Sequence, residues 1–248
     1  MIAHNESQIA ILKECGRIAK QALSEGMQAA EAGVSTLEIN NVVEKTIRLL
    51  KGTPSFLGYA TGDGSYPFAT CTPVNYQLVH TLPSDKVILK VGDILTLDLG
   101  VFYGGFHTDV AHTIEIESSK NTRFLMAGKK ALEKGLSATK AGNRVGDISF
   151  ELQRVIESYG FNVSVDLVGH GIGKNLHEPP QIPCFGKKRS GELLEKGHVL
   201  AVEVMYMAGE SGLVLGKDGF SLETRDKSLS AQFEHTLLVT DSAPLILA

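Results

Sequence analysis

Carboxylates and an imidazole that could hold metal ions stand within otherwise apolar stretches, at Asp98, Asp109, His170, Glu203 and Glu234. An isolated carboxylate on a buried strand is costly unless a cation or hydrogen-bond donors accompany it. Hard oxygen ligands with a borderline imidazole nitrogen suit divalent Co, Mn, Fe or Zn. Two such ions roughly 3.5 Å apart, bridged by carboxylates, activate a shared water in many hydrolases. These residue types therefore predict a hydrolase that uses two divalent metal ions as cofactors.

The two aspartates belong to a predicted β-hairpin over residues 94–114. Two β-rich segments flank Tyr103-Gly104-Gly105-Phe106, and Gly-Gly is a strong signal for a two-residue turn. With that turn, position 100 lies opposite Asp109, and Asp98 lies two residues further along the same face, so the carboxylates become diagonal neighbours. A different turn length would shift this register. The alternative places one Asp at a strand end and the other in a surface hairpin.

The other candidate ligands come from the second half of the chain. His170 lies in Gly169-His170-Gly171-Ile172-Gly173, and His177 follows seven residues later, a spacing that suits two side chains reaching one cleft from a loop. A lone His between glycines is more often structural than a ligand. Glu203 and Glu234 stand in apolar strands, where each alone could face water at an edge. Together, the acids and imidazoles are hard to place without cations.

The remaining pattern describes the elements that would position these residues. Apolar residues at helical spacing predict a first helix that ends near Gly33 and a second from a capping box at 35–38 to Leu50. Residues 54–84 are predicted as a loop with short strands. Further helices are predicted over 121–139 and 145–159, and β structure over 161–169, 198–207, 213–222 and 232–240. Because two helices and then strands occur twice, we expect an α+β fold of two similar halves around a central cleft, with residues 1–248 forming a single domain.

Composition narrows the class of protein. Hydrophobic residues make up 43% and charged residues 21% of the chain, as in an ordinary globular protein, and the net charge of −4 gives no reason to expect nucleic acid as the main ligand. The sequence shows no secretory signal and no bilayer-spanning run. The 3 cysteines are an odd number and form no C-x-x-C pair, which fits a reducing cytosol. We expect a cytoplasmic monomer with neither DNA nor membrane as a partner.

Four stretches resemble the type I methionine aminopeptidases, and the resemblance extends along almost the whole chain. They are 92–98, the Gly105-Phe106-His107-Thr108-Asp109 segment, 169–180 with both histidines, and the run Ser228-Leu229-Ser230-Ala231-Gln232-Phe233-Glu234-His235-Thr236. The resemblance implies the pita-bread fold of the creatinase and aminopeptidase group, with two pseudo-symmetric αβ halves around the site. It also implies removal of the initiator methionine from nascent proteins and N-terminal Met peptides whose second residue is small.

The same resemblance assigns roles to the candidate ligands. It implies that Asp98 binds one metal, that His170 and Glu203 bind the other, and that Asp109 and Glu234 bridge the two. In this family the metals lower the pKa of a bridging water so that hydroxide is available near neutral pH. Glu203 would also accept a proton and pass it to the leaving amine.

Matching positions also define the substrate site. The resemblance implies that His80 lies near the scissile amide nitrogen and His177 near the carbonyl oxygen, where it would stabilise the developing oxyanion. The methionine pocket would be formed by Tyr66, Cys71, Leu176 and Phe220, since an apolar pocket with polarisable contacts suits a thioether. Leu176 and Phe220 could equally be plain core residues.

This sequence departs from the family pattern at several positions. Val79 and Thr81 flank His80 where the family usually has Cys and Gly, and Val204 replaces a common Pro. Aromatic residues are more common than Leu176 at its position, and a larger indole often replaces Phe220. A few extra residues also occur around 60–65, near the expected substrate entrance. These differences bear on substrate breadth and rate.

Other functions remain open from the sequence. A prolidase or Xaa-Pro aminopeptidase would share fold and ligands, although such enzymes usually carry a further N-terminal domain. A non-catalytic binding protein of this fold would have lost its metals, and a serine hydrolase lacks support because no G-x-S-x-G elbow is present. A ribosome contact is a further hypothesis, because Lys217, Arg225 and Lys227 could meet RNA, although solvated surface charges are at least as plausible an interpretation.

Overall fold

A ten-stranded sheet forms the centre of the molecule, in a computed structural model that describes residues 1–3, 5–61 and 64–248. The main path runs β1-β6-β7-β14-β11-β9-β10, with β4 beside β6, β8 beside β11 and β15 beside β14. The strands of this sheet are β1 (Thr53–Pro54), β4 (Thr70–Cys71), β6 (Ile94–Tyr103), β7 (Phe106–Glu115), β8 (Asn162–Val163), β9 (Val168–Gly171), β10 (Glu178–Pro183), β11 (Val199–Met207), β14 (Ser230–Leu238) and β15 (Leu245–Ile246). Two small sheets comprise β12 (Leu213–Leu215), β13 (Leu222–Thr224) and β5 (Gln77–Val79), and β2 (Ala60–Thr61) with β3 (Gly64–Ser65).

Four long helices cover this sheet in two pairs. They are α1 (Glu6–Ala29), α2 (Thr36–Leu49), α3 (Thr122–Ala138) and α4 (Val145–Ser158). The predicted capping box is confirmed, because the Ser35 hydroxyl accepts from the Glu38 amide while Glu38 accepts from the Ser35 amide. Among the helices of the described residues, none is long and apolar enough to cross a membrane.

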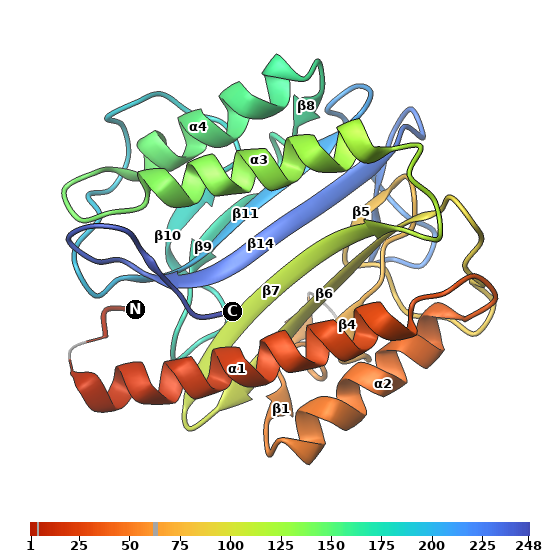
Figure 1. Cartoon of the computed structure of the whole chain (residues 1–248), viewed down its shortest axis with the longest axis horizontal. Helices are drawn as coiled ribbons and strands as arrows, with labels where there is room; N and C mark the ends of the chain where they lie inside the picture. Colours follow the sequence, from red (N-terminus) through yellow and green to blue (C-terminus); the bar gives the residue numbers. More distant parts are fainter. Residues whose placement is uncertain (4, 62–63) are drawn as a thin grey trace.

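The two helix pairs lie over opposite ends of the sheet. Figure 1 shows α1 and α2 along one end, α3 and α4 along the other, and β7 beside β14 between them. Helix α1 packs on β6 and β7, whereas α3 packs on β11 and β14. The helix and hairpin order therefore repeats in space as it does in sequence, and the predicted α+β arrangement of two similar halves is confirmed.

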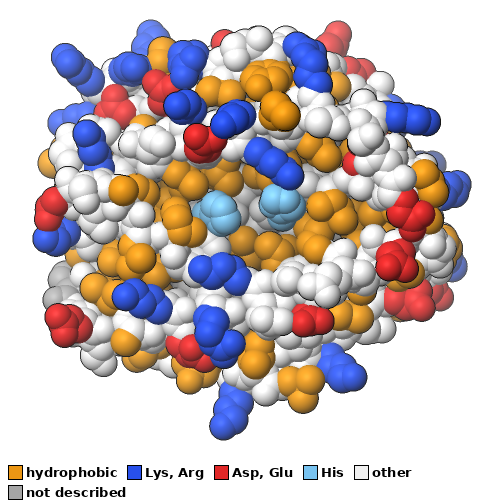
Figure 2. Space-filling view, viewed as in Figure 1, with side chains coloured by type: hydrophobic (Ala, Val, Ile, Leu, Met, Phe, Trp, Pro, Cys, Tyr) orange, Lys and Arg blue, Asp and Glu red, His pale blue; other side chains and the backbone are white. Residues whose placement is uncertain are grey.

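Side chains alternate between the two faces of the sheet, so one face packs on helices and the other is free for a site. On β14, Phe233 lies on the helix face, where its ring fills the space beside Gly128 of α3. Figure 2 shows this helix-bearing face, with histidines near its centre. The half-buried His112 and His235 belong to this face, since the His112 ring meets that of Phe233 edge-on and His235 lies two residues from Phe233 on β14. Glu234, between Phe233 and His235, therefore points to the opposite face.

Three predictions about strands are corrected. The segment 213–222, predicted as one strand, is two short strands, because a turn at 216–219 reverses the chain between β12 and β13. The segment 161–169 contains β8 and only the start of β9, separated by a bend. The sequence predicts no element over 178–183, because prolines cannot donate hydrogen bonds to a strand ladder, yet these residues form β10. It is tolerated because it lies at the end of the sheet order.

Candidate metal centre and substrate cleft

The hairpin β6–β7 presents Asp98 and Asp109 on one face. Gly104 and Gly105 form the turn with φ of 58° and 90°, a conformation that glycine adopts readily. Gly100 then pairs with Asp109, which is the register predicted from the turn. Asp98 is 6% and Asp109 4% exposed, so neither lies at a surface. The backbone around Asp109 is fixed by the Thr236 hydroxyl, which accepts from the Asp109 amide at 2.8 Å and donates to its carbonyl at 2.7 Å.

The second half contributes two glutamates that face each other across neighbouring strands. Glu203 on β11 pairs directly with Glu234 on β14, and both are buried. Like charges in directly opposite positions are destabilising. Gln232 lies between them: its side-chain amide donates to Glu203 at 2.9 Å and to Glu234 at 3.3 Å. The sequence analysis predicts no role for Gln232. Residues two apart on a strand share a face, so the spacing of Gln232 and Glu234 is the signal that places this amide beside the glutamate.

His170 reaches the same group from β9. Its Nδ1 lies 2.8 Å from the carbonyl oxygen of Gly171, which can only accept, so Nδ1 carries the hydrogen and Nε2 keeps a lone pair. Burial lowers the pKa of His170 to about 4, which keeps the ring neutral. The neighbouring glycine serves the backbone, because a Cβ on Gly171 would lie 2.0 Å from the Pro179 carbonyl. The absence of a side chain at Gly171 therefore permits the close packing of β9 against β10.

These groups are arranged as divalent cations require. Ligand atoms of Asp109, His170 and Glu234 all lie within 4.8 Å of one another. Burial raises the pKa of Asp109 to about 7 and that of Glu203 to about 8, and burial with neighbouring carboxylates raises the pKa values of Asp98 and Glu234 well above the usual range. Within the described residues, no Lys or Arg pairs with these acids. One oxygen of Asp98 and one of Glu234 lack a hydrogen-bond partner there. The donor set fits hard or borderline metal ions, which would supply the missing positive charge.

His177 and His80 are exposed side chains of the same cavity. The His177 ring makes an edge contact with that of His170, with centroids 4.4 Å apart, and its Nδ1 lies 2.6 Å from the Tyr59 hydroxyl. His80 follows β5 with a φ of 60°, which is rare for a residue with a Cβ. Such strain persists where surrounding structure imposes it and is common at functional sites. Here the neighbouring Val79 pairs with Leu222 of β13.

Because the backbone of His80 is strained, two substitutions there can separate the contribution of the imidazole to activity from the effect on protein stability. His80→Ala and His80→Gly should lose peptidase activity to a similar extent, about 10²-fold or more if the imidazole assists proton transfer. The glycine variant should be the more stable by about 1 kcal/mol, since glycine adopts positive φ without a Cβ clash. Steady-state kinetics and thermal unfolding of both variants would measure this. Equal activity to wild type in His80→Gly would exclude an active role for the ring.

The predicted methionine-pocket residues line the same cavity. The buried Tyr66 donates its hydroxyl to the carbonyls of Thr70 and Thr81, and its ring meets that of Phe220 edge-on, with centroids 5.8 Å apart. Cys71 of β4 is buried and pairs with Asp98 of β6. Leu176 also belongs to an apolar core cluster. Leu176 therefore lines the cavity and also packs in the core, while its part in a methionine pocket stays a prediction.

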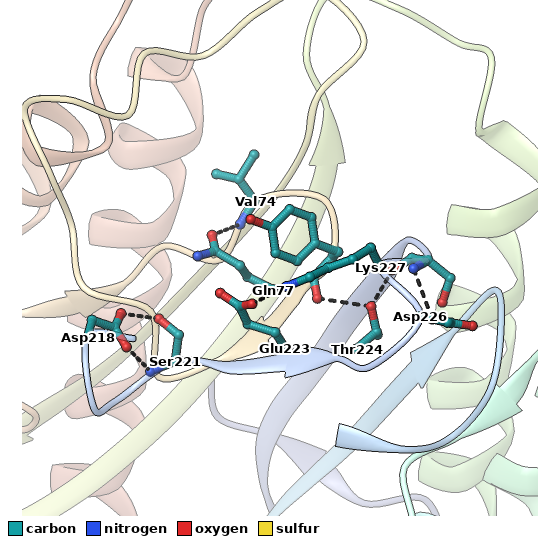
Figure 3. Close-up of polar contacts among 10 residues, drawn as sticks. Val74, Gln77, Asp218, Ser221, Glu223, Thr224, Asp226 and Lys227 are labelled. Carbon is teal, nitrogen blue, oxygen red and sulfur yellow. Dashed lines mark hydrogen bonds and ion pairs between the residues drawn. The ribbon is translucent and has the colours of Figure 1, made fainter. Parts of the chain in front are cut away.

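Phe220 is positioned by the turn between β12 and β13. Asp218 accepts hydrogen bonds from the Phe220 amide at 3.0 Å, the Ser221 amide at 2.9 Å and the Ser221 hydroxyl. Figure 3 shows this turn beside the small sheet in which Gln77 of β5 lies against Glu223 of β13. Since β5 leads directly into His80, one small sheet places both Phe220 and His80 on the cavity wall.

The departures from the family pattern fall mostly away from the metal ligands. Val204 lies in the core cluster on the helix face, because it is one residue beyond Glu203 on a strand. Val79 and Thr81 are buried on either side of His80. In the extra segment around 60–65, β2 and β3 form a short antiparallel pair, while residues 62 and 63 lie outside the described residues.

A cavity of about 1460 Å³ collects all the predicted site residues. Its lining includes the candidate ligands and the candidate substrate-binding residues Asp98, Asp109, His170, Glu203, Glu234, His80, His177, Tyr66, Cys71, Leu176 and Phe220. The volume exceeds the roughly 300–1,000 Å³ typical of small-molecule sites. It can therefore hold a methionine side chain together with part of a peptide.

A family model for metallopeptidase family M24 matches residues 10–241. The chain belongs to metallopeptidase family M24. Methionine aminopeptidase of Clostridium acetobutylicum is 34% identical to this M24 chain, over 100% of the chain and 98% of its own length. Methionine aminopeptidase 1 of Bacillus subtilis is 36% identical, over 98% and 96%. The crystal structure of methionine aminopeptidase from Thermotoga maritima has a TM-score of 0.94 and 37% identity, covering 100% of this chain and 99% of that one. The predicted family, metalloexopeptidase class and pita-bread fold are confirmed.

The likeness of this M24 chain to prolidases shows a common fold. The crystal structure of the prolidase from Pyrococcus horikoshii has a TM-score of 0.76 at 22% identity. The match covers 99% of this chain but 63% of the prolidase, whereas the methionine aminopeptidases match over their full length. This difference in coverage favours the methionine aminopeptidases over the prolidases, two groups that the candidate ligands alone did not distinguish.

Proposed function

We propose that this M24 chain removes the N-terminal methionine from peptides and nascent proteins whose second residue is small. The observation that carries the proposal is the single cavity that brings the candidate ligands together with both histidines and the apolar pocket. The full-length likeness to methionine aminopeptidases supports the same activity. We further propose that residues 1–248 act as one catalytic domain.

Two divalent metal ions are the proposed cofactors. Asp98 would hold one ion, His170 and Glu203 the other, and Asp109 and Glu234 would be shared. When bound, the ions act as Lewis acids and make water a nucleophile near neutral pH. The carboxylates, which burial disfavours as anions, would become ionised beside the cations.

The remaining residues would orient the substrate and move protons. Glu203 would accept a proton from the attacking water and return it to the leaving amine, while Gln232 holds one of its oxygens. His177 would donate a hydrogen bond to the substrate carbonyl oxygen, where negative charge develops. His80 would contact the scissile amide nitrogen. The apolar wall with Tyr66 and Phe220 would take the methionine side chain.

The proposed activity is tested by adding metals back to chelator-treated protein. Titration with Mn, Fe, Co and Zn on a Met-Ala-Ser peptide should restore cleavage after methionine, with saturation near two ions per chain. An Xaa-Pro peptide should remain uncut under the same conditions. Cleavage of only the Xaa-Pro peptide would indicate a prolidase-type enzyme, and no cleavage with any metal would favour a non-catalytic binding protein.

We also propose that the protein contacts the ribosome on the side where the substrate would enter the cavity. Lys217 and Arg225 are exposed around β12 and β13, and could meet RNA phosphates in the cytoplasm. Lys227 contributes less free charge, because its ammonium pairs with Glu223 at 2.5 Å and lies over the Tyr76 ring. Charge reversal of Lys217 and Arg225 is expected to weaken co-sedimentation with ribosomes at low salt.

A further inference from the structure

The ring of His177 is held between two other rings. On one side lies His170, with centroids 4.4 Å apart and planes at 69°, and on the other lies Tyr59, with centroids 5.1 Å apart and planes at 76°. The Tyr59 hydroxyl is 2.6 Å from His177 Nδ1. This contact joins residues 118 positions apart in the sequence. Neither the family motifs nor the spacing of the site residues indicated it.

Either group could donate in this contact, and the two choices place the hydrogen of His177 on different ring nitrogens. A phenol is a good donor with an ordinary pKa near 10, and a neutral imidazole offers one ring nitrogen as acceptor. With Tyr59 donating to Nδ1, the hydrogen of His177 must be on Nε2. A substrate carbonyl oxygen can only accept, so this is the tautomer that can serve it.

Backbone hydrogen bonds fix the main chain at Tyr59. The Tyr59 amide donates to the Phe56 carbonyl at 2.9 Å, and the Tyr66 amide donates to the Tyr59 carbonyl at 2.9 Å. The Ser55 amide donates to the Gly100 carbonyl at 2.9 Å, and Gly100 is the residue opposite Asp109. Tyr59 is therefore connected to the strands that carry the candidate metal ligands, and it stands at the base of the extra β2–β3 segment.

We propose that Tyr59 is a positioning residue that fixes His177 as the Nε2–H tautomer and so directs a hydrogen-bond donor at the substrate carbonyl. The catalytic consequence rests on the proposed function, whereas the hydrogen bond itself does not. The simpler alternative is that Tyr59, with 38% of its surface exposed, is only an aromatic wall of the cavity. A phenylalanine would then serve as well.

The Tyr59→Phe variant separates these alternatives, because it keeps the ring and removes only the hydroxyl. Nitrogen-15 NMR of histidine-labelled, zinc-loaded protein reports the tautomer, with the His177 signals identified from their loss in His177→Gln. In wild type, Nδ1 should resonate as an unprotonated nitrogen and Nε2 as a protonated one. In Tyr59→Phe both should move toward the average of the two tautomers. The control is Tyr103→Phe, since Tyr103 does not line the cavity.

Kinetics on a Met-Ala-Ser peptide supply the second readout. Loss of one hydrogen bond should lower kcat of Tyr59→Phe by about 2- to 10-fold, with KM nearly unchanged. Unchanged His177 nitrogen signals in Tyr59→Phe, or a protonated Nδ1 in wild type, would overturn the proposal. A shifted tautomer with unchanged kcat would overturn its catalytic part. An inactive wild type would instead refute the proposed function, and the NMR result would still decide the hydrogen bond.

Discussion

Asp109→Ala and Glu234→Ala are each expected to lower kcat/KM on a methionyl peptide by about 10³-fold or more. Each substitution removes one of the two carboxylates that, with His170, place ligand atoms within 4.8 Å of one another. Losing a proposed bridge should cost several kcal/mol of transition-state stabilisation, and about 1.4 kcal/mol corresponds to tenfold in rate. The metal content of protein purified without chelator should fall in parallel, as measured by elemental analysis.

The matched control is Asp85→Ala, because Asp85 is an exposed acid that does not line the cavity. It should keep both activity and metal. Circular dichroism of each variant would show whether the fold persists. Wild-type activity in either Asp109→Ala or Glu234→Ala would be incompatible with a bridging role for that residue.

The metal-free protein is expected to lose thermal stability as the pH rises from about 6.5 to about 8, above the range in which the lowered pKa of His170 acts in the opposite direction. The pKa of Asp109 is raised from 3.8 to about 7 and that of Glu203 from 4.5 to about 8 by burial. A raised pKa in the folded state means that folding favours the protonated form. The stabilisation is thus fully present below the unfolded pKa values and is lost as the pH passes the folded ones. About 2–3 kcal/mol should be lost between pH 6.5 and pH 8, and at about 2–4 °C per kcal/mol the melting temperature should fall by roughly 5–10 °C.

Replacing Glu234 with glutamine provides the control for this pH dependence. Glu234→Gln keeps the shape of the side chain and removes one buried charge that faces Glu203. Without metal, this variant should melt higher than wild type at pH 8 and change less with pH, although it should be nearly inactive. Bound metal should remove most of the pH dependence of the wild type. A melting temperature of the metal-free wild type that rises between pH 6.5 and pH 8 would contradict this electrostatic account.

Local sequence signals are sufficient to predict the structure where a single turn or helix start determines it. The Gly104-Gly105 turn predicts the pairing of Gly100 with Asp109, because a two-residue turn leaves one register for the strands that follow. The Ser35 capping box likewise predicts the start of α2. In both cases the interacting residues are close in sequence, so propensity and spacing contain the necessary information.

Contacts between distant segments were not predictable in the same way. Strand β10 forms at the end of the sheet from a proline-rich segment whose own propensity opposes a strand, and packing against β9 overrides it. The hydrogen bond between Tyr59 and His177 depends on how a surface segment folds over the cavity. The family resemblance supplied the candidate site residues, whereas Gln232 and Tyr59 became apparent only from the distances.

The pairing of β7 with β14 also has a consequence for synthesis on the ribosome. Asp98 and Asp109 belong to the first half of the chain, while Glu234 arrives on β14, the strand that pairs with β7 through Ala111 and Val110. Chains are made from the N-terminus, and early segments can fold before later ones appear. The first hairpin can therefore form while its carboxylates still lack their partners. The proposed set of metal ligands in a growing chain therefore stays incomplete until Glu234 has emerged from the ribosome.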